Sequence, residues 1–227
     1  SGMKSLYTQY VTDGMYVVRQ SLGGAGYSAW SGIPRIIDDY SPQVTFEGDN
    51  TVMAQQATNF LLKQAKKARQ GKSKAKFEGV FEYLCHLDEL KIKRCSASKA
   101  EHFLNLDLIE EALKVETAAR LSFIMDKMAS EKKVSKKDFT NSLYALELVE
   151  LSNAHIKYVT FFNFKQRLLK GDIECSGVTK VLTNLCMLYG LHTLHSESKK
   201  LYEMGYFAEG VTYSELILDG IKMLNTE

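Results

Sequence analysis

The stretch LIEEALKVETAARLSF, residues 108–123, decides the fold class. Apolar residues recur in it at every third or fourth position, as on one face of an α-helix: Leu108, Ala112, Val115, Ala119 and Phe123. The same spacing returns over residues 144–158 and 178–189. No convincing alternation of apolar and polar residues marks a β-strand. The sequence therefore predicts an all-α protein.

Glycine and proline are scarce in the middle of the chain. Neither occurs between Gly79 and Gly171, and the two prolines are Pro34 and Pro42. Proline costs a helix interior about 3 kcal/mol and glycine about 1 kcal/mol, so this composition permits long helices. Long antiparallel helices with short connections predict a bundle. We expect helices over residues 4–21, 50–70, 76–91, 103–131, 136–170 and 174–191, and a helical region 193–224 broken near Gly205 and Gly210.

Composition excludes several classes of protein. The chain has 227 residues, 45% hydrophobic and 25% charged, which is enough for one large or two modest globular domains. Its net charge of +2 favours no nucleic-acid partner, and no apolar run is long enough to span a membrane. Neither a CxxC pair nor a complete set of metal ligands accompanies the cysteines and histidines, so we expect free thiols and no metal site.

Basic residues concentrate in one segment. Residues 63–76 contain seven lysines or arginines with Gly71 and Ser73 among them, and no aromatic residues interleave. This pattern is typical of a solvated helix end followed by a linker. At the start, Ser1 and Gly2 before Met3 resemble the remnant of a cleaved tag, so we leave them out of the predicted fold.

A glycine-rich segment, QSLGGAGY at residues 20–27, follows the first predicted helix directly. Clustered glycines let backbone N–H groups approach a ligand closely, and phosphate groups often bind in this way. A simple helix stop and turn explains the same residues equally well. The segment is not a strand-turn-helix dinucleotide motif, because no strand precedes it.

A second segment, TFEGDNT at residues 45–51, places Glu47 between an aromatic residue and a glycine. An apolar neighbour raises the pKa of a glutamate and makes it a useful base near neutral pH. Alternatively, Glu47 and Asp49 only complement the positive end of the helix that follows, for which Asn50 is the expected N-cap. Spacing alone favours this second interpretation.

Together these segments resemble the carboxy-terminal helical domain of the acyl-CoA oxidases, within the acyl-CoA dehydrogenase superfamily. The family pattern is approximately C-G-G-H-G-Y-S, then S-G-L-P, then T-[FY]-E-G-[DE]-N-T-V. This chain has LGGAGYS at 22–28, SGIP at 31–34 and TFEGDNTV at 45–52. The following QATNFLLK (56–63) is also similar, and weaker resemblance continues through the Ala154-His155 pair. The resemblance covers nearly the whole chain, and residues 15–63 are diagnostic.

The resemblance implies an FAD-dependent acyl-CoA oxidase of fatty acid β-oxidation, a homodimer located in the peroxisome. Glu47 would be the base that removes the α-proton of a fatty acyl-CoA, while the β-hydrogen passes as hydride to the flavin. The product would be trans-2-enoyl-CoA, and oxygen would reoxidise the flavin with release of hydrogen peroxide.

The resemblance also assigns binding residues. Gln20, Gly23 and Gly24 match positions at the FAD pyrophosphate, with FAD held mainly by the other subunit. Asp49, Asn50 and Thr51 match positions at the FAD adenosine, and Phe46 and Gly48 match positions at the substrate. The chain departs from the family at two positions, where Leu22 and Ala25 replace a cysteine and a histidine.

By the same resemblance, residues 3–70 are the last helices of the flavin and acyl-CoA domain, 71–80 a linker and 81–227 a second helical bundle. In the family, an amino-terminal helical domain and a β-domain come before this region. We therefore expect this chain alone not to turn over acyl-CoA.

Two alternatives stay open. One is a non-enzymatic helical scaffold. The other is a dehydrogenase that passes electrons to a flavoprotein, which the oxidase-like Gly48-Asp49-Asn50-Thr51 and the helices beyond residue 80 disfavour.

Overall fold

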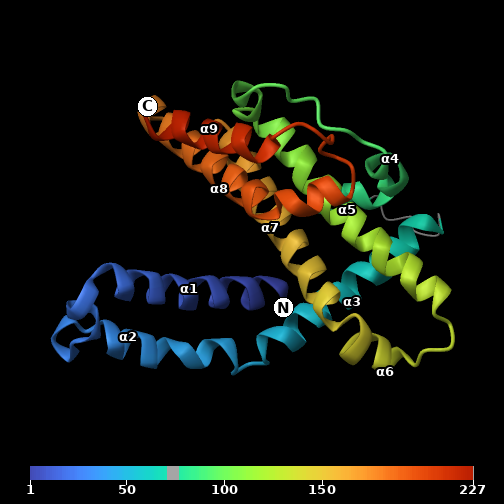
Figure 1. Cartoon of the computed structure of the whole chain (residues 1–227), viewed down its shortest axis with the longest axis horizontal. Helices are drawn as coiled ribbons and strands as arrows, with labels where there is room; N and C mark the ends of the chain where they lie inside the picture. The colour runs from blue at the N-terminus through green and yellow to red at the C-terminus, as the bar shows by residue number, and fades with distance from the viewer. Residues whose placement is uncertain (71–76, 227) are drawn as a thin grey trace. The chain divides into compact units, whose positions relative to one another are not determined.

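The computed structural model describes residues 1–70 and 77–226, and the regular elements in these ranges are all helical (Figure 1). The predicted all-α fold is therefore confirmed. Most of the predicted linker, residues 71–76, lies outside the described residues.

The chain forms two compact units, Ser1–Leu62 with Lys133–Ile156, and Lys63–Lys132 with Lys157–Glu227. The domains predicted from the sequence were continuous segments, whereas each unit combines two segments. Two long helices explain the difference, since α3 (Asn50–Arg69) and α7 (Ala145–Leu169) each contribute residues to both units.

The first unit contains a helical hairpin, drawn in blue in Figure 1. Its arms are α1 (Gly2–Ser21) and α2 (Ile33–Tyr40), joined by the 3-10 turns η1 (Gly23–Tyr27) and η2 (Ala29–Ser31). A helix is thus present between the predicted helices 4–21 and 50–70, where the sequence analysis expected none. Pro34 lies in its first turn, where the fixed φ angle suits a helix and the missing N–H costs nothing.

The rest of this unit is built from the turn η3 (Ser41–Val44), the start of α3, the short α6 (Lys136–Asp138), the π turn η6 (Phe139–Leu143) and the start of α7. The Thr58 hydroxyl donates to the Leu148 carbonyl oxygen at 2.6 Å, which joins α3 to α7. Leaving Gly2 out of the fold was wrong. It is buried in α1, and a Cβ there would lie 2.7 Å from Cγ1 of Ile156.

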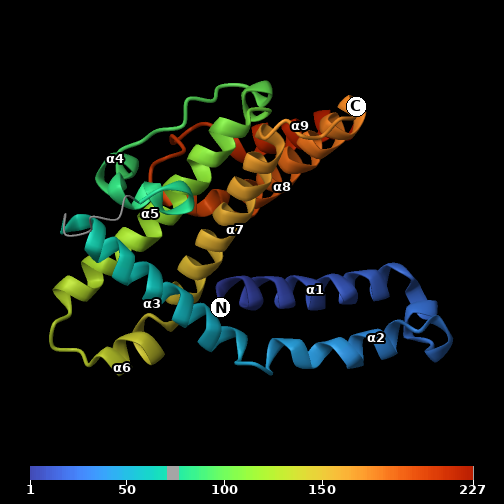
Figure 2. The same ribbon diagram turned by 180° about the vertical axis from the view of Figure 1, so that it is seen from behind.

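The second unit is organised around three helices that lie side by side in both views (Figures 1 and 2): α5 (Leu106–Ser130), α8 (Ser176–Glu203) and α9 (Tyr213–Asn225). Its shorter elements are η4 (Gly79–Cys85), α4 (Leu87–Lys91) and η5 (Ala100–Phe103). Three predicted helix bounds were wrong. The 76–91 helix is a 3-10 turn plus a short helix, the 136–170 helix is interrupted at η6, and α8 continues past residue 193.

Burial confirms the predicted apolar face of α7 but not that of α8. In α7, Leu148, Leu151 and Tyr158 are buried. In α8, Val178 and Leu185 are about half exposed, while the buried face holds Cys186, Met187, Gly190, Leu191 and Leu194. The reason is a close approach at Gly190, where a Cβ would lie 2.4 Å from Cγ2 of Ile109 in α5. A glycine contributes nothing to an apolar count, so the sequence pattern pointed to the wrong face.

Four charged side chains form a partly buried network in the second unit. Arg120 in α5 donates to Glu116 through Nε and to Glu197 in α8 through Nη2, each at 2.9 Å. Lys157 in α7 donates to the other Glu197 oxygen at 2.7 Å. Burial, and then the charge of Glu197, raise the pKa of Glu116 to about 7.

Candidate functional site

The loop with the predicted base has an unusual backbone. Glu47 has φ = 58°, and in the described chain no other residue except glycine has a positive φ. The next residue, Gly48, has φ = 107°. A left-handed conformation costs a residue with a side chain on the order of 1 kcal/mol or more, and such residues cluster at functional sites. The backbone at Glu47 is therefore held in an unfavourable conformation by its surroundings, while the Glu47 side chain is exposed.

Three contacts fix this loop. The backbone N–H groups of Thr45 and Phe46 both donate to the Pro42 carbonyl at 2.9 Å. Lys4 Nζ in α1 donates to the Gly48 carbonyl at 2.7 Å. A Cβ at Gly48 would lie 2.7 Å from Sδ of Met53, so both the φ angle and the packing require glycine next to Glu47.

The start of α3 follows directly. Asp49 Oδ1 accepts a hydrogen bond from the Thr51 backbone N–H at 2.9 Å. Asn50 lies inside the helix, and its Oδ1 accepts from Lys4 Nζ at 2.9 Å and from Thr8 Oγ1 at 3.1 Å. The prediction of Asn50 as N-cap was therefore wrong, because Asp49 provides the cap. The Thr51 side chain is exposed.

The glycine-rich segment folds back on the end of α1. A Cβ at Gly26 would lie 2.1 Å from the Arg19 carbonyl oxygen, so the turn packs against α1 only with glycine there. Gly23 has φ = 57°. At Gly24 neither a positive φ nor close packing requires glycine, because a Cβ there would meet no atom within 4 Å. Within this chain, the space above Gly24 is open.

Arg19 lies under this turn, and the sequence analysis did not identify it. Its guanidinium carbon is 4.7 Å from the ring centroids of both Tyr16 and Tyr27. Its buried Nε has no hydrogen-bond partner. The signal in the sequence was the arginine three residues after one tyrosine, followed by another tyrosine at the end of the glycine-rich turn.

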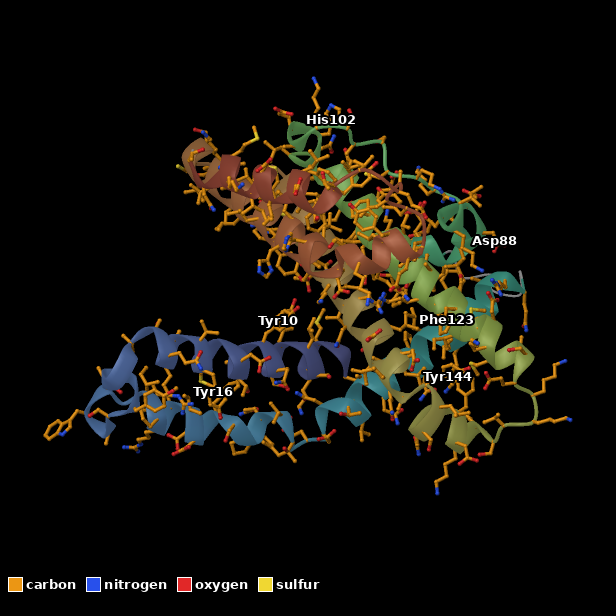
Figure 3. All side chains as sticks on the ribbon, in the orientation of Figure 1. Tyr10, Tyr16, Asp88, His102, Phe123 and Tyr144 are labelled. Carbon is orange, nitrogen blue, oxygen red and sulfur yellow. The ribbon has the colours of Figure 1, made fainter. Side chains whose placement is uncertain are left out.

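The predicted site residues form two groups at opposite ends of α1. Lys4, in its first turn, contacts Gly48 and Asn50, whereas Gln20 is in its last turn (Figure 1). At 1.5 Å per residue, Lys4 and Gln20 are separated by roughly 24 Å along the helix. Figure 3 labels Tyr10 and Tyr16 between these ends. One chain therefore does not gather all of the predicted cofactor residues around one point.

In residues 1–70 and 77–226, no cluster of three or more His, Cys, Asp or Glu side chains could hold a metal ion. In the same residues, no helix has the length and apolar character needed to cross a membrane.

Comparison with known proteins gives matches along both units. Residues 1–62 match the family model "Acyl-CoA oxidase, C-alpha1 domain", and residues 105–224 match the model "Acyl-CoA oxidase". Peroxisomal acyl-coenzyme A oxidase 1 of Arabidopsis thaliana is 34% identical over 195 residues, which are 86% of this chain and 28% of that protein.

Solved structures show the same fold. Acyl-CoA oxidase 1 of Arabidopsis thaliana superposes with a TM-score of 0.88 at 29% identity, covering 99% of this chain and 33% of that one. Acyl-CoA oxidase-2 of Caenorhabditis elegans, bound with FAD, ascaroside-CoA and ATP, has a TM-score of 0.81 at 23% identity over 98% of this chain and 31% of that one. The chain thus spans about a third of the length of these relatives.

Proposed function

Since the chain belongs to the acyl-CoA oxidase family, as part of its carboxy-terminal helical region, we propose that the whole protein oxidises fatty acyl-CoA thioesters to trans-2-enoyl-CoA. The proposed cofactor is FAD, which is present in solved structures of two Caenorhabditis elegans acyl-CoA oxidases. Oxygen is the proposed electron acceptor and the peroxisome the proposed location, as the names of the homologues suggest. The observation that carries the proposal is Glu47 in a left-handed conformation within a fixed loop.

Glu47 acts as the base in this proposal. Its carboxylate accepts the proton from the α-carbon of the thioester. Proton transfer requires the base to be positioned close to that carbon, so a fixed loop backbone favours the reaction. The contacts of Gly48 to Lys4 and Met53 hold the backbone from which the Glu47 side chain extends. When bound, FAD would supply the redox chemistry, as acceptor of the β-hydrogen as hydride and donor of its electrons to oxygen, with hydrogen peroxide as the product. Phe46, 45% exposed beside the base, offers an apolar surface to the acyl chain.

Two features of this chain fit FAD. The open space above Gly24 lets a diphosphate approach the backbone, and the Arg19 guanidinium, which contacts Tyr27 of the same turn, has no oxygen acceptor within the described residues. Gln20, Gly23 and Gly24 hold the diphosphate, and Asp49, Asn50 and Thr51 hold the adenosine. The diphosphate and the adenosine are neighbouring parts of FAD, whereas these two groups of residues lie at opposite ends of α1. One FAD molecule would therefore contact the first group in one chain and the second group in another chain, and a homodimer supplies both chains.

The test is the colour and turnover of the full-length protein. We expect flavin absorbance in the purified dimer and hydrogen peroxide on addition of fatty acyl-CoA. Residues 1–227 alone should form no hydrogen peroxide. Flavin and product formed only with an artificial electron acceptor would instead identify a dehydrogenase. A colourless protein that yields no product would favour the non-enzymatic scaffold. The replacement of the family's histidine by Ala25 supports that alternative.

A further inference from the structure

Arg19 differs from the other arginines in having aromatic rings as its neighbours and no oxygen acceptor. Among the described residues, its guanidinium makes no ion pair and no hydrogen bond, and its Nε is buried. Every other arginine side chain contacts a carboxylate or carbonyl oxygen: Arg35, Arg69, Arg94, Arg120 and Arg167. The two outer nitrogens of Arg19, Nη1 and Nη2, also have no hydrogen-bond partner but are not buried, so they are the donors that an acceptor from outside the chain can reach.

Its neighbours keep the guanidinium in place. Gly26 packs against the Arg19 carbonyl oxygen, which brings Tyr27 over the guanidinium, and Tyr16 covers it from the preceding turn of α1. Two aromatic rings hold a guanidinium by cation–π attraction and leave the N–H groups of Nη1 and Nη2 free to point outward in its plane. Planar N–H pairs match the oxygens of phosphate groups.

The position of Arg19 also answers an electrostatic difficulty. An anion at the glycine-rich turn faces the carboxy-terminal end of α1, where the helix dipole is negative and repels it. Glycines alone therefore do not make this turn a phosphate site. Arg19 is the basic residue in the last turn of α1 and reverses the sign of the local charge.

We propose that Arg19 binds the diphosphate group of a nucleotide ligand at the glycine-rich turn, Gly23–Tyr27. The inference rests on the proposed function, in which both FAD and the coenzyme A part of the substrate carry a diphosphate. It adds a binding residue to the positions assigned by resemblance, Gln20, Gly23 and Gly24. Arg19 touches no reacting atom and is a ligand-binding residue.

The test compares Arg19→Ala and Arg19→Lys with Arg35→Ala in the full-length protein. Arg35 is a matched control, because it lies in the same unit and already pairs with Asp39. Binding of FAD to the flavin-free protein is measured by fluorescence quenching, and binding of a fatty acyl-CoA by the change in the absorbance of bound flavin. Loss of a charge-assisted hydrogen bond predicts about ten- to a hundredfold weaker binding of one ligand in Arg19→Ala. Arg19→Lys keeps the charge without the planar fork, so we expect a smaller loss.

The ligand that loses affinity identifies the source of the diphosphate. Unchanged affinity for both, with only a lower melting temperature, would overturn the proposal and leave Arg19 as a support for the turn. Inorganic pyrophosphate separates this outcome from failure of the proposed function. Even if the whole protein bound no flavin, pyrophosphate should raise the melting temperature of the wild type and of Arg35→Ala but not of Arg19→Ala. Equal shifts in all three would contradict the role of Arg19.

Discussion

The buried carboxyl of Glu116 predicts a stability that falls as the pH rises towards neutral. Its pKa is about 7 in the folded chain, against 4.5 for an ordinary glutamate. Between these values the folded chain binds a proton that the unfolded chain has lost. The stabilisation is therefore complete below the lower value and is lost as the pH rises through the upper one. The change Glu116→Gln replaces the carboxyl by an amide that does not titrate and keeps the shape of the side chain.

The size of the effect follows from the pKa difference. At about 1.4 kcal/mol per pH unit, the difference between 4.5 and about 7 corresponds to a loss on the order of 3 kcal/mol. The groups that face Glu116 modify it. Arg120 and Lys157 favour its charged form, and Glu197 disfavours it. The pKa of Glu197 is lowered, so that residue loses stabilisation only at more acidic pH.

Urea unfolding of the wild type, Glu116→Gln and Glu215→Gln measures this difference between about pH 5 and about pH 8. Glu215 is an exposed control on α9. Comparison with the variant is needed because the pKa of buried His155 is lowered to about 4, which weakens the fold as the pH falls below its ordinary value. We expect the free energy of unfolding of Glu116→Gln to increase relative to that of the wild type as the pH rises. A constant difference between them would refute the reasoning.

Two glycines give further predictions. Gly190→Ala should destabilise the chain by about 1–3 kcal/mol in urea unfolding, because its Cβ would lie 2.4 Å from Cγ2 of Ile109. Gly177→Ala in the same helix, where the nearest atom is 3.9 Å away, should cost nothing, and equal effects would contradict the packing. Gly48→Ala places a Cβ 2.7 Å from Sδ of Met53 and should lower turnover of the full-length protein up to about a hundredfold with its flavin content retained. Unchanged turnover would show that the loop tolerates movement.

Periodicity and the absence of glycine and proline were enough to predict the helical class and the bounds of α1 and α5. They were not enough for α8, because its buried face centres on Gly190, and close packing at a glycine leaves no apolar signal. The helix α2 was hidden within a stretch rich in glycine, serine and aromatic residues, since Pro34 marks a helix start as well as a turn.

The candidate site was predicted mostly by resemblance. The spacing of Glu47 alone favoured a simple helix-end role, and its positive φ cannot be read from the residue types around it. Nor could the sequence indicate that Gln20 and Asn50 lie at opposite ends of α1. Arg19 escaped notice because its meaning depends on a contact between Gly26 and the end of α1, which brings Tyr27 over it.

The role of Glu47 is tested most directly by the bleaching of flavin absorbance when fatty acyl-CoA is added without oxygen. The full-length wild type and Glu47→Gln are compared with Asp38→Asn, an exposed carboxylate in the same unit. The account predicts rapid bleaching in the wild type and the control. In Glu47→Gln it predicts bound flavin that acyl-CoA does not bleach. Equally fast bleaching in Glu47→Gln would contradict the assignment of Glu47 as the base.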